Sequence, residues 1–318
     1  MDPLYKNQPP NQIDSTIDRQ TVPPAYSQTG NPIMARWTSF DLIFFDCDST
    51  LSAIEGVDEL AALKGKGGRV GLLTQKAMDG HLQLEHVYGK RLRAIRPTRG
   101  QLASVAQMYW DRRIADAAEV VAALQLLTKQ VYIISGGLAA PVRDFGRRLG
   151  VAEERIRAVE LEFNELSGDW WKYYAPEASQ EQAYLDYDNG PLTASSGKAQ
   201  IIRELAGETW GRRMMIGDGM SDAAAKTAVD LFVGFGGVAR RTRVEAAADV
   251  FLYPPRLAPI LPLAAGPVGY ELLRNTPYES LFEEGLALCR QPESVHFTDP
   301  AQAEAFFSAF EPPASGSV

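Results

Sequence analysis

Four short apolar runs interrupt an otherwise mixed pattern of hydrophobic and polar residues. They span residues 41–45, 131–134, 214–216 and 230–234. Continuous apolar runs of this length, bounded by small or acidic residues, are typical of parallel strands that are covered on both faces. The pattern therefore predicts an α/β protein with an open parallel sheet at its core.

The residues between the first two runs have helical rather than strand periodicity. Gly and Pro residues separate the helices that we predict there, which span 57–63, 69–79, 84–95 and 99–108. A further predicted helix, 119–127, leads into the second run. This insertion is too long for a simple crossover between two strands. We therefore expect it to form a helical cap inserted after the first strand.

The two ends of the chain and one internal segment have weaker patterns. Residues 1–37 are rich in Asn, Gln, Pro, Ser and Thr, a composition that favours a flexible tail. Alternation around Ser167-Gly168-Asp169 predicts a hairpin over 161–174, whose second arm carries Trp170, Trp171, Tyr173 and Tyr174. The C-terminal segment contains one predicted helix, 279–288. The domains that we predict are a tail (1–37), a core (38–53 and 131–253), a helical cap (54–130) and a C-terminal extension (254–318).

Composition narrows the class of protein and its partners. The 318 residues are 45% hydrophobic and 23% charged, as expected for a soluble chain with one large core and a smaller domain. The net charge of -8 argues against nucleic acid or an anionic membrane as the main partner, and favours a small polar ligand. Cys47 and Cys289 provide no disulfide framework, and no apolar run is long enough to span a bilayer. We therefore expect a cytoplasmic protein.

Two carboxylates follow the first apolar run. Asp46 and Asp48 stand at i and i+2 as the chain leaves a strand, so both side chains can face the same side. One carboxylate can attack phosphorus, while the other donates a proton to the leaving oxygen and then activates water. An isolated Asp-x-Asp is more simply explained as a solvated turn. The catalytic interpretation therefore depends on the other motifs.

Two more carboxylates, Asp218 and Asp222, follow the third run. Attack by a carboxylate on a phosphate dianion meets charge repulsion, and Mg²⁺ bound by oxygen ligands is the usual solution. We expect Asp218 to be a direct ligand and Asp222 to support it. The alternative is that both are turn and helix-capping residues.

Phosphate-binding groups are predicted at two further places. Ser135-Gly136-Gly137 follows the second run and precedes a predicted helix, an arrangement that offers a hydroxyl and backbone N–H groups to phosphate oxygens. Lys198 can neutralise the charge of the phosphate and the nucleophile together. Each feature alone is also common on surfaces and in ordinary turns, so neither is specific by itself.

Together these motifs resemble those of the phosphoserine phosphatase branch of the haloacid dehalogenase (HAD) superfamily. Four motifs occur in the expected order, and the resemblance covers residues 39–253. It implies a Rossmann-like core with an inserted helical cap. It also implies Asp46 as nucleophile, Asp48 as general acid and base, and Mg²⁺ held by the side chains of Asp46 and Asp218 and the backbone carbonyl of Asp48. Residues 234–237 also resemble a segment of the eukaryotic-type enzymes.

The same resemblance extends to substrate-binding residues in the cap. Glu55 stands where the family places a Glu near the substrate amine, and Arg91 where its Arg pairs with the substrate carboxylate. A Glu and an Arg together suit a zwitterionic amino-acid head, and Met78 would close the pocket. Ser221 stands where relatives have Asn or Thr, and keeps a hydroxyl for the phosphate.

The sequence thus predicts a Mg²⁺-dependent phosphomonoesterase whose substrate is a small phosphorylated metabolite, with phosphoserine as the first choice. Two alternatives remain at this stage. One is a phosphatase or phosphotransferase for another small phosphate ester, such as a sugar phosphate. The other is a phosphate-binding regulatory protein without turnover.

Overall fold

The computed structural model describes residues 37–167, 170–172 and 180–311. Most of the predicted tail, 1–37, lies outside this range, as do Gly168, Asp169, Tyr173 and Tyr174 of the predicted hairpin. No helix in the described ranges is both long and apolar enough to cross a membrane.

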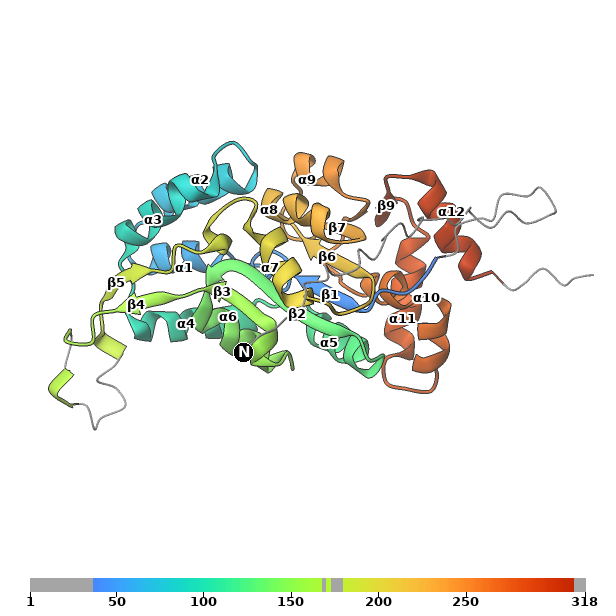
Figure 1. Cartoon of the computed structure of the whole chain (residues 1–318), viewed down its shortest axis with the longest axis horizontal. Helices are drawn as coiled ribbons and strands as arrows, with labels where there is room; N and C mark the ends of the chain where they lie inside the picture. Colours follow the sequence, from blue (N-terminus) through green and yellow to red (C-terminus); the bar gives the residue numbers. More distant parts are fainter. Residues whose placement is uncertain (1–36, 168–169, 173–179, 312–318) are drawn as a thin grey trace, which may run out of the picture. The chain divides into compact units, whose positions relative to one another are not determined.

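A seven-stranded sheet with the order β3-β2-β1-β6-β7-β8-β9 forms the core (Figure 1). All neighbouring pairs are parallel except β8 and β9. The predicted parallel α/β fold is therefore confirmed, and each of the four apolar runs lies in a strand. The strands are β1 (Leu42–Phe45), β2 (Gln130–Leu138), β3 (Ile156–Val159), β6 (Arg213–Gly217), β7 (Leu231–Phe235), β8 (Val250–Leu252) and β9 (Val295–Phe297).

The register of the three central strands aligns their carboxyl ends. Phe45, near the end of β1, pairs with Ile133 of β2 on one side and with Ile216 of β6 on the other. All four residues of β1 are fully buried, because the strand is central and both of its faces are covered. The residues that follow these strands therefore meet at one edge of the sheet, where ligands bind in open α/β folds.

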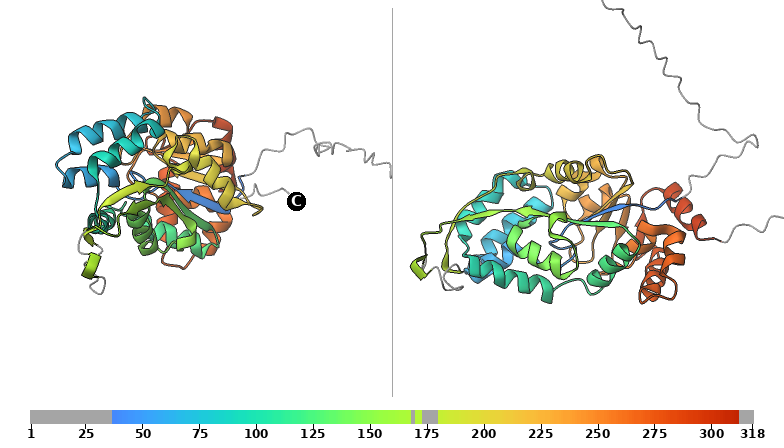
Figure 2. Two further views of the ribbon diagram at one scale, coloured as in Figure 1. Left: turned by 60° about the vertical axis from the view of Figure 1, so that its left-hand side comes forward. Right: turned by 60° about the horizontal axis from the view of Figure 1, so that its bottom comes forward.

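Helices cover both faces of the sheet (Figure 2). In the views of Figure 2, α5 and α6 lie on one face and α7, α8 and α9 on the other. This division follows from right-handed crossovers that run outward from β1 in opposite directions. The bounds are α5 (Ala117–Leu126), α6 (Ala139–Arg148), α7 (Gly197–Ala206), α8 (Met220–Ala224) and α9 (Thr242–Ala247).

The insertion after β1 is helical, as the sequence predicts. Its helices are α1 (Gly56–Leu63), α2 (Gly67–Met78), α3 (Leu84–Ile95) and α4 (Arg99–Asp111). The helix that follows them, α5, packs against β2 and α10 and so lies with the core helices. The proposed division into core and cap at residues 54 and 130 stays a prediction, and this packing favours an earlier end of the cap.

The C-terminal segment adds structure that the sequence pattern did not reveal. It contains α10 (Ile260–Leu273), α11 (Glu279–Cys289), β9 and α12 (Pro300–Ala309). The predicted helix 279–288 is confirmed as α11. The pattern missed α10 because Pro267 and Gly266 interrupt it, and Gly266 has non-helical backbone angles. Since β9 pairs with β8, residues 295–297 extend the core sheet.

The pairing of the predicted hairpin is wrong. Strand β4 (Leu161–Phe163) pairs with β5 (Tyr184–Tyr187), whereas Trp170 and Trp171 lie in the short helix η2 (Trp170–Lys172). Alternation identified the first arm but could not show that its partner lies much further along the chain. The other short helices are η1 (Glu153–Arg155), η4 (Pro191–Thr193) and η5 (Ala225–Ala228).

Candidate active site

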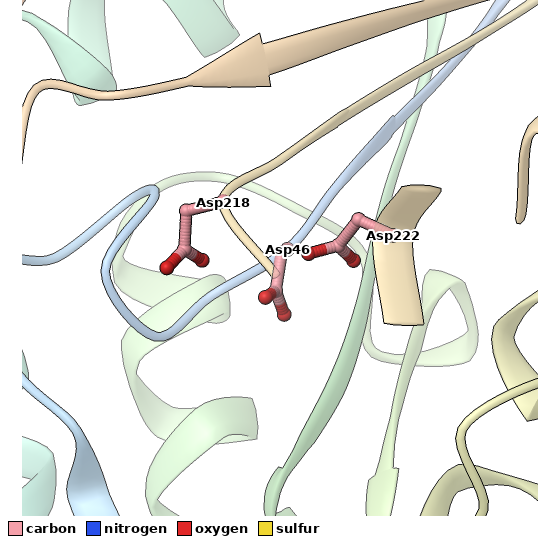
Figure 3. Close-up of side chains that lie close together, drawn as sticks. All are labelled: Asp46, Asp218 and Asp222. Atoms are coloured by element: carbon pink, nitrogen blue, oxygen red, sulfur yellow. The ribbon is translucent and has the colours of Figure 1, made fainter. Parts of the chain in front are cut away.

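Three buried carboxylates meet at the carboxyl edge of the sheet. Asp46 follows β1, Asp218 follows β6, and Asp222 lies in α8. Each offers an oxygen atom, and these oxygens lie within 4.8 Å of one another. Asp46 lies between the other two (Figure 3). Three negative side chains that are buried together need compensating positive charge.

Lys198 provides part of that charge. Its Nζ lies 2.7 Å from Oδ1 of Asp46 and 2.5 Å from Oδ1 of Asp222, and its side chain is almost completely buried. Burial alone would lower the pKa of Lys198, but Asp222 and Asp46 raise it above its ordinary value. Lys198 follows Gly197 at the start of α7, where a Cβ on Gly197 would lie 1.6 Å from the carbonyl oxygen of Pro191. Only glycine allows this close packing, which positions the lysine.

The cluster also fits a divalent cation. Burial, together with the neighbouring carboxylates, raises the pKa of Asp46, although Lys198 opposes the shift. Burial raises the pKa of Asp218 to about 6, although Arg241 opposes it. Both oxygens of Asp222 already accept hydrogen bonds, Oδ1 from Lys198 and Oδ2 from the backbone N–H of Gly219 at 2.9 Å. The oxygens of Asp218 are engaged as well, Oδ1 by the hydroxyl of Thr50 at 3.2 Å and Oδ2 by Arg241. Carboxylate oxygens are ligands that Mg²⁺ prefers, so the cluster as a whole offers ligands for the ion, and Asp46 and Asp218 stay the predicted direct ligands.

Asp48 is held by three hydrogen bonds beside this cluster. Its Oδ1 accepts from the backbone N–H of Gly56 at 2.7 Å and from the hydroxyl of Tyr109 at 2.6 Å, and its Oδ2 accepts from Oγ of Ser135 at 3.1 Å. Sequence reasoning missed Tyr109, because it belongs to the regular buried face of α4. No local signal distinguishes it from an ordinary core residue.

The predicted phosphate-binding motif lies between a strand and a helix, as the sequence predicts. Ser135, Gly136 and Gly137 belong to the end of β2, and α6 begins only at Ala139. Oγ of Ser135 accepts a hydrogen bond from the N–H of Gly137 at 2.8 Å. A Cβ on Gly137 would lie 2.6 Å from Oδ2 of Asp48. The second glycine thus allows the loop to approach the predicted general acid.

The predicted residues of the cap face the same pocket as those of the core. Most of the predicted site residues line it, while Ser135, Asp218 and Asp222 are not among its lining residues. The volume of the pocket is about 40 Å³ in this closed arrangement. Its lining includes Asp46, Asp48, Glu55, Met78, Arg91, Gly136, Lys198 and Ser221.

Glu55 and Arg91 are both largely buried, and they differ in how their polar atoms are satisfied. Oε1 of Glu55 accepts a hydrogen bond from Oγ of Ser49 at 2.7 Å, while burial and the nearby carboxylate of Asp48 raise its pKa. Nη1 of Arg91 donates to Oγ1 of Thr74 at 2.9 Å. Nε of Arg91 is buried and has no hydrogen-bond partner among the described residues. A buried donor of this kind is costly unless a ligand satisfies it.

Arg241 is a second residue that sequence reasoning missed. Its guanidinium forms an ion pair with Asp218 and lies 3.8 Å from Oε1 of Glu55 and 3.6 Å from Oδ1 of Asp79. It follows the glycine-rich segment 234–237, which the resemblance identified without naming an arginine. Arg241 therefore links the carboxyl edge of the sheet to the cap.

Several curated proteins are similar to this chain over most of its length. A phosphoserine phosphatase of Drosophila melanogaster is 30% identical over 241 residues, which cover 75% of this chain and 83% of the relative. The enzyme of Mus musculus is 32% identical over 209 residues, covering 65% of this chain and 86% of the relative. The chloroplastic phosphoserine phosphatase of Arabidopsis thaliana is 31% identical over 225 residues, covering 70% of this chain and 71% of the relative. No protein-family model matches the chain.

Solved structures share the fold. A phospho-aspartyl intermediate analogue of phosphoserine phosphatase and a substrate-bound phosphoserine phosphatase complex each superpose with a TM-score of 0.59 at 22% identity. Each match covers 70% of this chain and 98% of the solved chain. The sequence relatives and the shared fold confirm the resemblance found in the four motifs. The chain therefore belongs to the phosphoserine phosphatase family of the HAD superfamily.

Proposed function

We propose that this protein hydrolyses L-phosphoserine to L-serine and phosphate through an aspartyl-phosphate on Asp46. The observation that carries the proposal is the single pocket in which Asp46, Asp48 and Lys198 of the core meet Glu55 and Arg91 of the cap. The core residues supply the chemistry of phosphoryl transfer, and the cap residues match an amino-acid head. The names of the relatives support the same substrate.

The reaction proceeds in two displacements. In the first, a carboxylate oxygen of Asp46 forms a bond to phosphorus, the bond between phosphorus and the serine oxygen breaks, and Asp48 transfers a proton to that oxygen. In the second, Asp48 takes a proton from water, whose oxygen attacks the aspartyl-phosphate and releases phosphate. The ammonium group of Lys198, 2.7 Å from Asp46, stabilises the negative charge on the nucleophile and on the phosphoryl oxygens in both steps. Ser221, which lines the pocket, and Ser135, whose hydroxyl donates to Asp48, are the proposed hydroxyl contacts to the phosphate.

The acidic cluster is the proposed Mg²⁺ site. The side chains of Asp46 and Asp218 and the backbone carbonyl of Asp48 would hold the ion, and Asp222 would support them by fixing Lys198 and Gly219. When bound, Mg²⁺ would offset the charge of the phosphoryl group and the attacking carboxylate. Burial and the neighbouring carboxylates raise the pKa values of Asp46 and Asp218, so a bound cation would favour their ionised forms.

The substrate's amino-acid head is assigned to the cap. Arg91 binds the carboxylate, because its buried Nε lacks a partner among the described residues and a guanidinium matches a carboxylate in shape. Glu55 accepts from the ammonium group, and Met78 adds apolar contact. Burial raises the pKa of Glu55 and Arg241, 3.8 Å from its Oε1, opposes the shift, so the substrate ammonium would be a second cation that favours the ionised form.

Substrate entry requires the pocket to widen. A volume of about 40 Å³ holds a few water molecules at most and is too small for phosphoserine. Arg243 donates to the carbonyl oxygens of Gly80 at 2.8 Å and Asp79 at 3.2 Å, and so ties the cap to the core. Opening of the cap at this contact, followed by closure over the substrate, would exclude water until the serine oxygen has left.

The test is phosphate release from L-phosphoserine, phosphothreonine and sugar phosphates, with and without Mg²⁺. We expect metal-dependent turnover with a preference for phosphoserine, and loss of turnover in Asp46→Asn, which keeps the shape of the side chain but not its charge. Undiminished activity of Asp46→Asn would overturn the nucleophile.

The cap residues are tested separately. Arg91→Ala should raise KM for phosphoserine at least tenfold, because a buried charged contact to the substrate is lost, which corresponds to about 1.4 kcal/mol or more. An unchanged catalytic efficiency on phosphoserine would refute amino-acid recognition while leaving the core chemistry intact. Metal-dependent turnover of a sugar phosphate alone would lead to the same conclusion.

A further inference from the structure

A second and larger pocket lies away from the catalytic residues. Its volume is about 490 Å³, within the range typical of small-molecule sites. Apolar residues of α4, α6 and β4 form its walls, among them Leu102, Ala106, Ala140, Leu161 and Phe163. It shares no lining residue with the catalytic pocket. The proposed phosphatase activity does not use it.

Most of the charges at the rim of this pocket are already paired. Nη2 of Arg148 lies 2.8 Å from Oδ2 of Asp144, and Glu160 forms an ion pair with Arg143. Both acidic residues of the rim are thus neutralised by neighbouring arginines. They leave no excess negative charge to attract a cation.

Arg99 is the exception. Its guanidinium lies 4.6 Å from the centre of the Phe163 ring, and its Nε donates to Oε1 of Gln182 at 2.5 Å. Within the described part of the chain, no carboxylate pairs with Arg99, and its two terminal nitrogens make no hydrogen bond. Stacking on the aromatic ring holds the guanidinium in place with these nitrogens available. A fixed guanidinium of this kind suits a carboxylate, which it can bind through two parallel hydrogen bonds.

We propose that this pocket binds a small monocarboxylic acid with an apolar body. The carboxylate pairs with Arg99 at the rim, and the hydrocarbon part lies against the walls formed by α4 and α6. Burial of the apolar part supplies most of the affinity, and the single unpaired arginine fixes the orientation. A phosphorylated ligand is disfavoured, since Asp144 and Glu160 are already paired and one exposed arginine gives too little positive charge for a dianion.

Both walls of the pocket lead to catalytic residues. Helix α4 carries Tyr109, whose hydroxyl donates to Asp48, and α6 continues directly from the strand end that holds Ser135 and Gly137. A ligand lodged between α4 and α6 therefore acts on the position of the general acid. We expect it to change kcat more than KM, because Glu55 and Arg91 belong to other elements of the cap.

The experiment is calorimetric titration of the full chain with hexanoate, with hexylamine as the oppositely charged probe of similar shape. Excess inorganic phosphate and MgCl₂ are present to occupy the catalytic site. We expect saturable binding of hexanoate and none of hexylamine. Arg99→Met should weaken hexanoate binding at least tenfold. Ala103→Trp, which fills the pocket from its exposed mouth, should abolish it. Arg290→Met is the matched control, since this exposed arginine follows α11 and lines neither pocket.

Several results would overturn the proposal. They are the absence of saturable binding, equal affinity in wild type and Arg99→Met, or competition between hexanoate and L-phosphoserine. The last result would place the acid at Arg91 in the catalytic pocket. A kinetic measurement completes the test: hexanoate should change kcat of the wild type and leave kcat of Ala103→Trp unchanged. Because binding is measured without turnover, failure here is distinguishable from failure of the proposed phosphatase activity.

Discussion

Gly137→Ala should impair catalysis by displacing Asp48. A Cβ at this position would lie 2.6 Å from Oδ2 of Asp48, whereas an ordinary carbon–oxygen contact is about 3.4 Å. The carboxylate or the loop must therefore move by about 0.8 Å, and a misplacement of this order costs about 100-fold in rate. We expect kcat/KM for phosphoserine to fall by about 100-fold, which corresponds to about 2.7 kcal/mol of transition-state stabilisation.

The neighbouring glycine provides the comparison. A Cβ on Gly136 would meet only the carbonyl oxygen of Leu192 at 3.4 Å and Cδ2 of Leu84 at 3.9 Å, so Gly136→Ala does not displace Asp48. We therefore expect Gly136→Ala to lower kcat/KM by less than about tenfold. Steady-state kinetics, with thermal melts to confirm folding, measure both variants. The steric argument fails if Gly137→Ala folds normally and is as active as Gly136→Ala.

Three further outcomes are expected. Tyr109→Phe removes one of three hydrogen bonds to Asp48. It should lower kcat by about 10- to 100-fold with KM nearly unchanged, since a hydrogen bond to a charged group contributes about 1.5–3 kcal/mol. A fall in kcat/KM through KM alone would contradict a positioning role. Burial raises the pKa of Asp218 from 3.8 to about 6. In the metal-free protein, Asp218 therefore adds to the free energy of unfolding below about pH 4, and this contribution is lost as the pH rises through about 6. Added MgCl₂ should therefore raise Tm in chelator-treated samples more at pH 8 than at pH 5, and an equal rise at both values would exclude this linkage. Arg243→Met removes the hydrogen bonds from one nitrogen to the carbonyl oxygens of Gly80 and Asp79. It should raise KM by less than about tenfold with kcat retained, because this exposed contact contributes about 1 kcal/mol. Unaffected substrate binding in stopped-flow measurements would show that the contact does not hold the cap closed.

The periodicity of the chain was sufficient to predict most helices and the central strands. Runs such as 41–45 are apolar throughout because the strand is buried on both faces, which is a property that a sequence displays directly. The helix over 99–111 begins with a capping box formed by Thr98 and Gln101. Predictions were less successful where partners are distant, as with β4, whose partner β5 begins only at Tyr184.

The candidate site divides in the same way. Sequence motifs were sufficient to predict the core residues of the site, because each residue lies at the end of a strand or the start of a helix and is identified by its immediate neighbours in sequence. These residues are Asp46, Asp48, Ser135, Lys198, Asp218 and Asp222. The roles of these residues remain predictions, but their convergence at one edge is observed.

Only the tertiary structure revealed Tyr109 and Arg241. Tyr109 has the sequence context of any core residue on an amphipathic helix, and its hydroxyl acquires a partner only when α4 packs beside the turn after β1. Arg241 lies in a loop far along the chain from Glu55, and their separation of 3.8 Å depends on how the cap folds over the sheet.

The sequence by itself determined the α/β class, the order of the catalytic motifs and the family, because these depend on residue types and on local periodicity. The tertiary structure decided which strand pairs with β4, the extension of the core sheet by β9, the closed volume of the catalytic pocket and the pocket between α4 and α6. Those features arise from contacts between segments far apart in the chain, and hydrophobic periodicity carries no information about which distant segments meet.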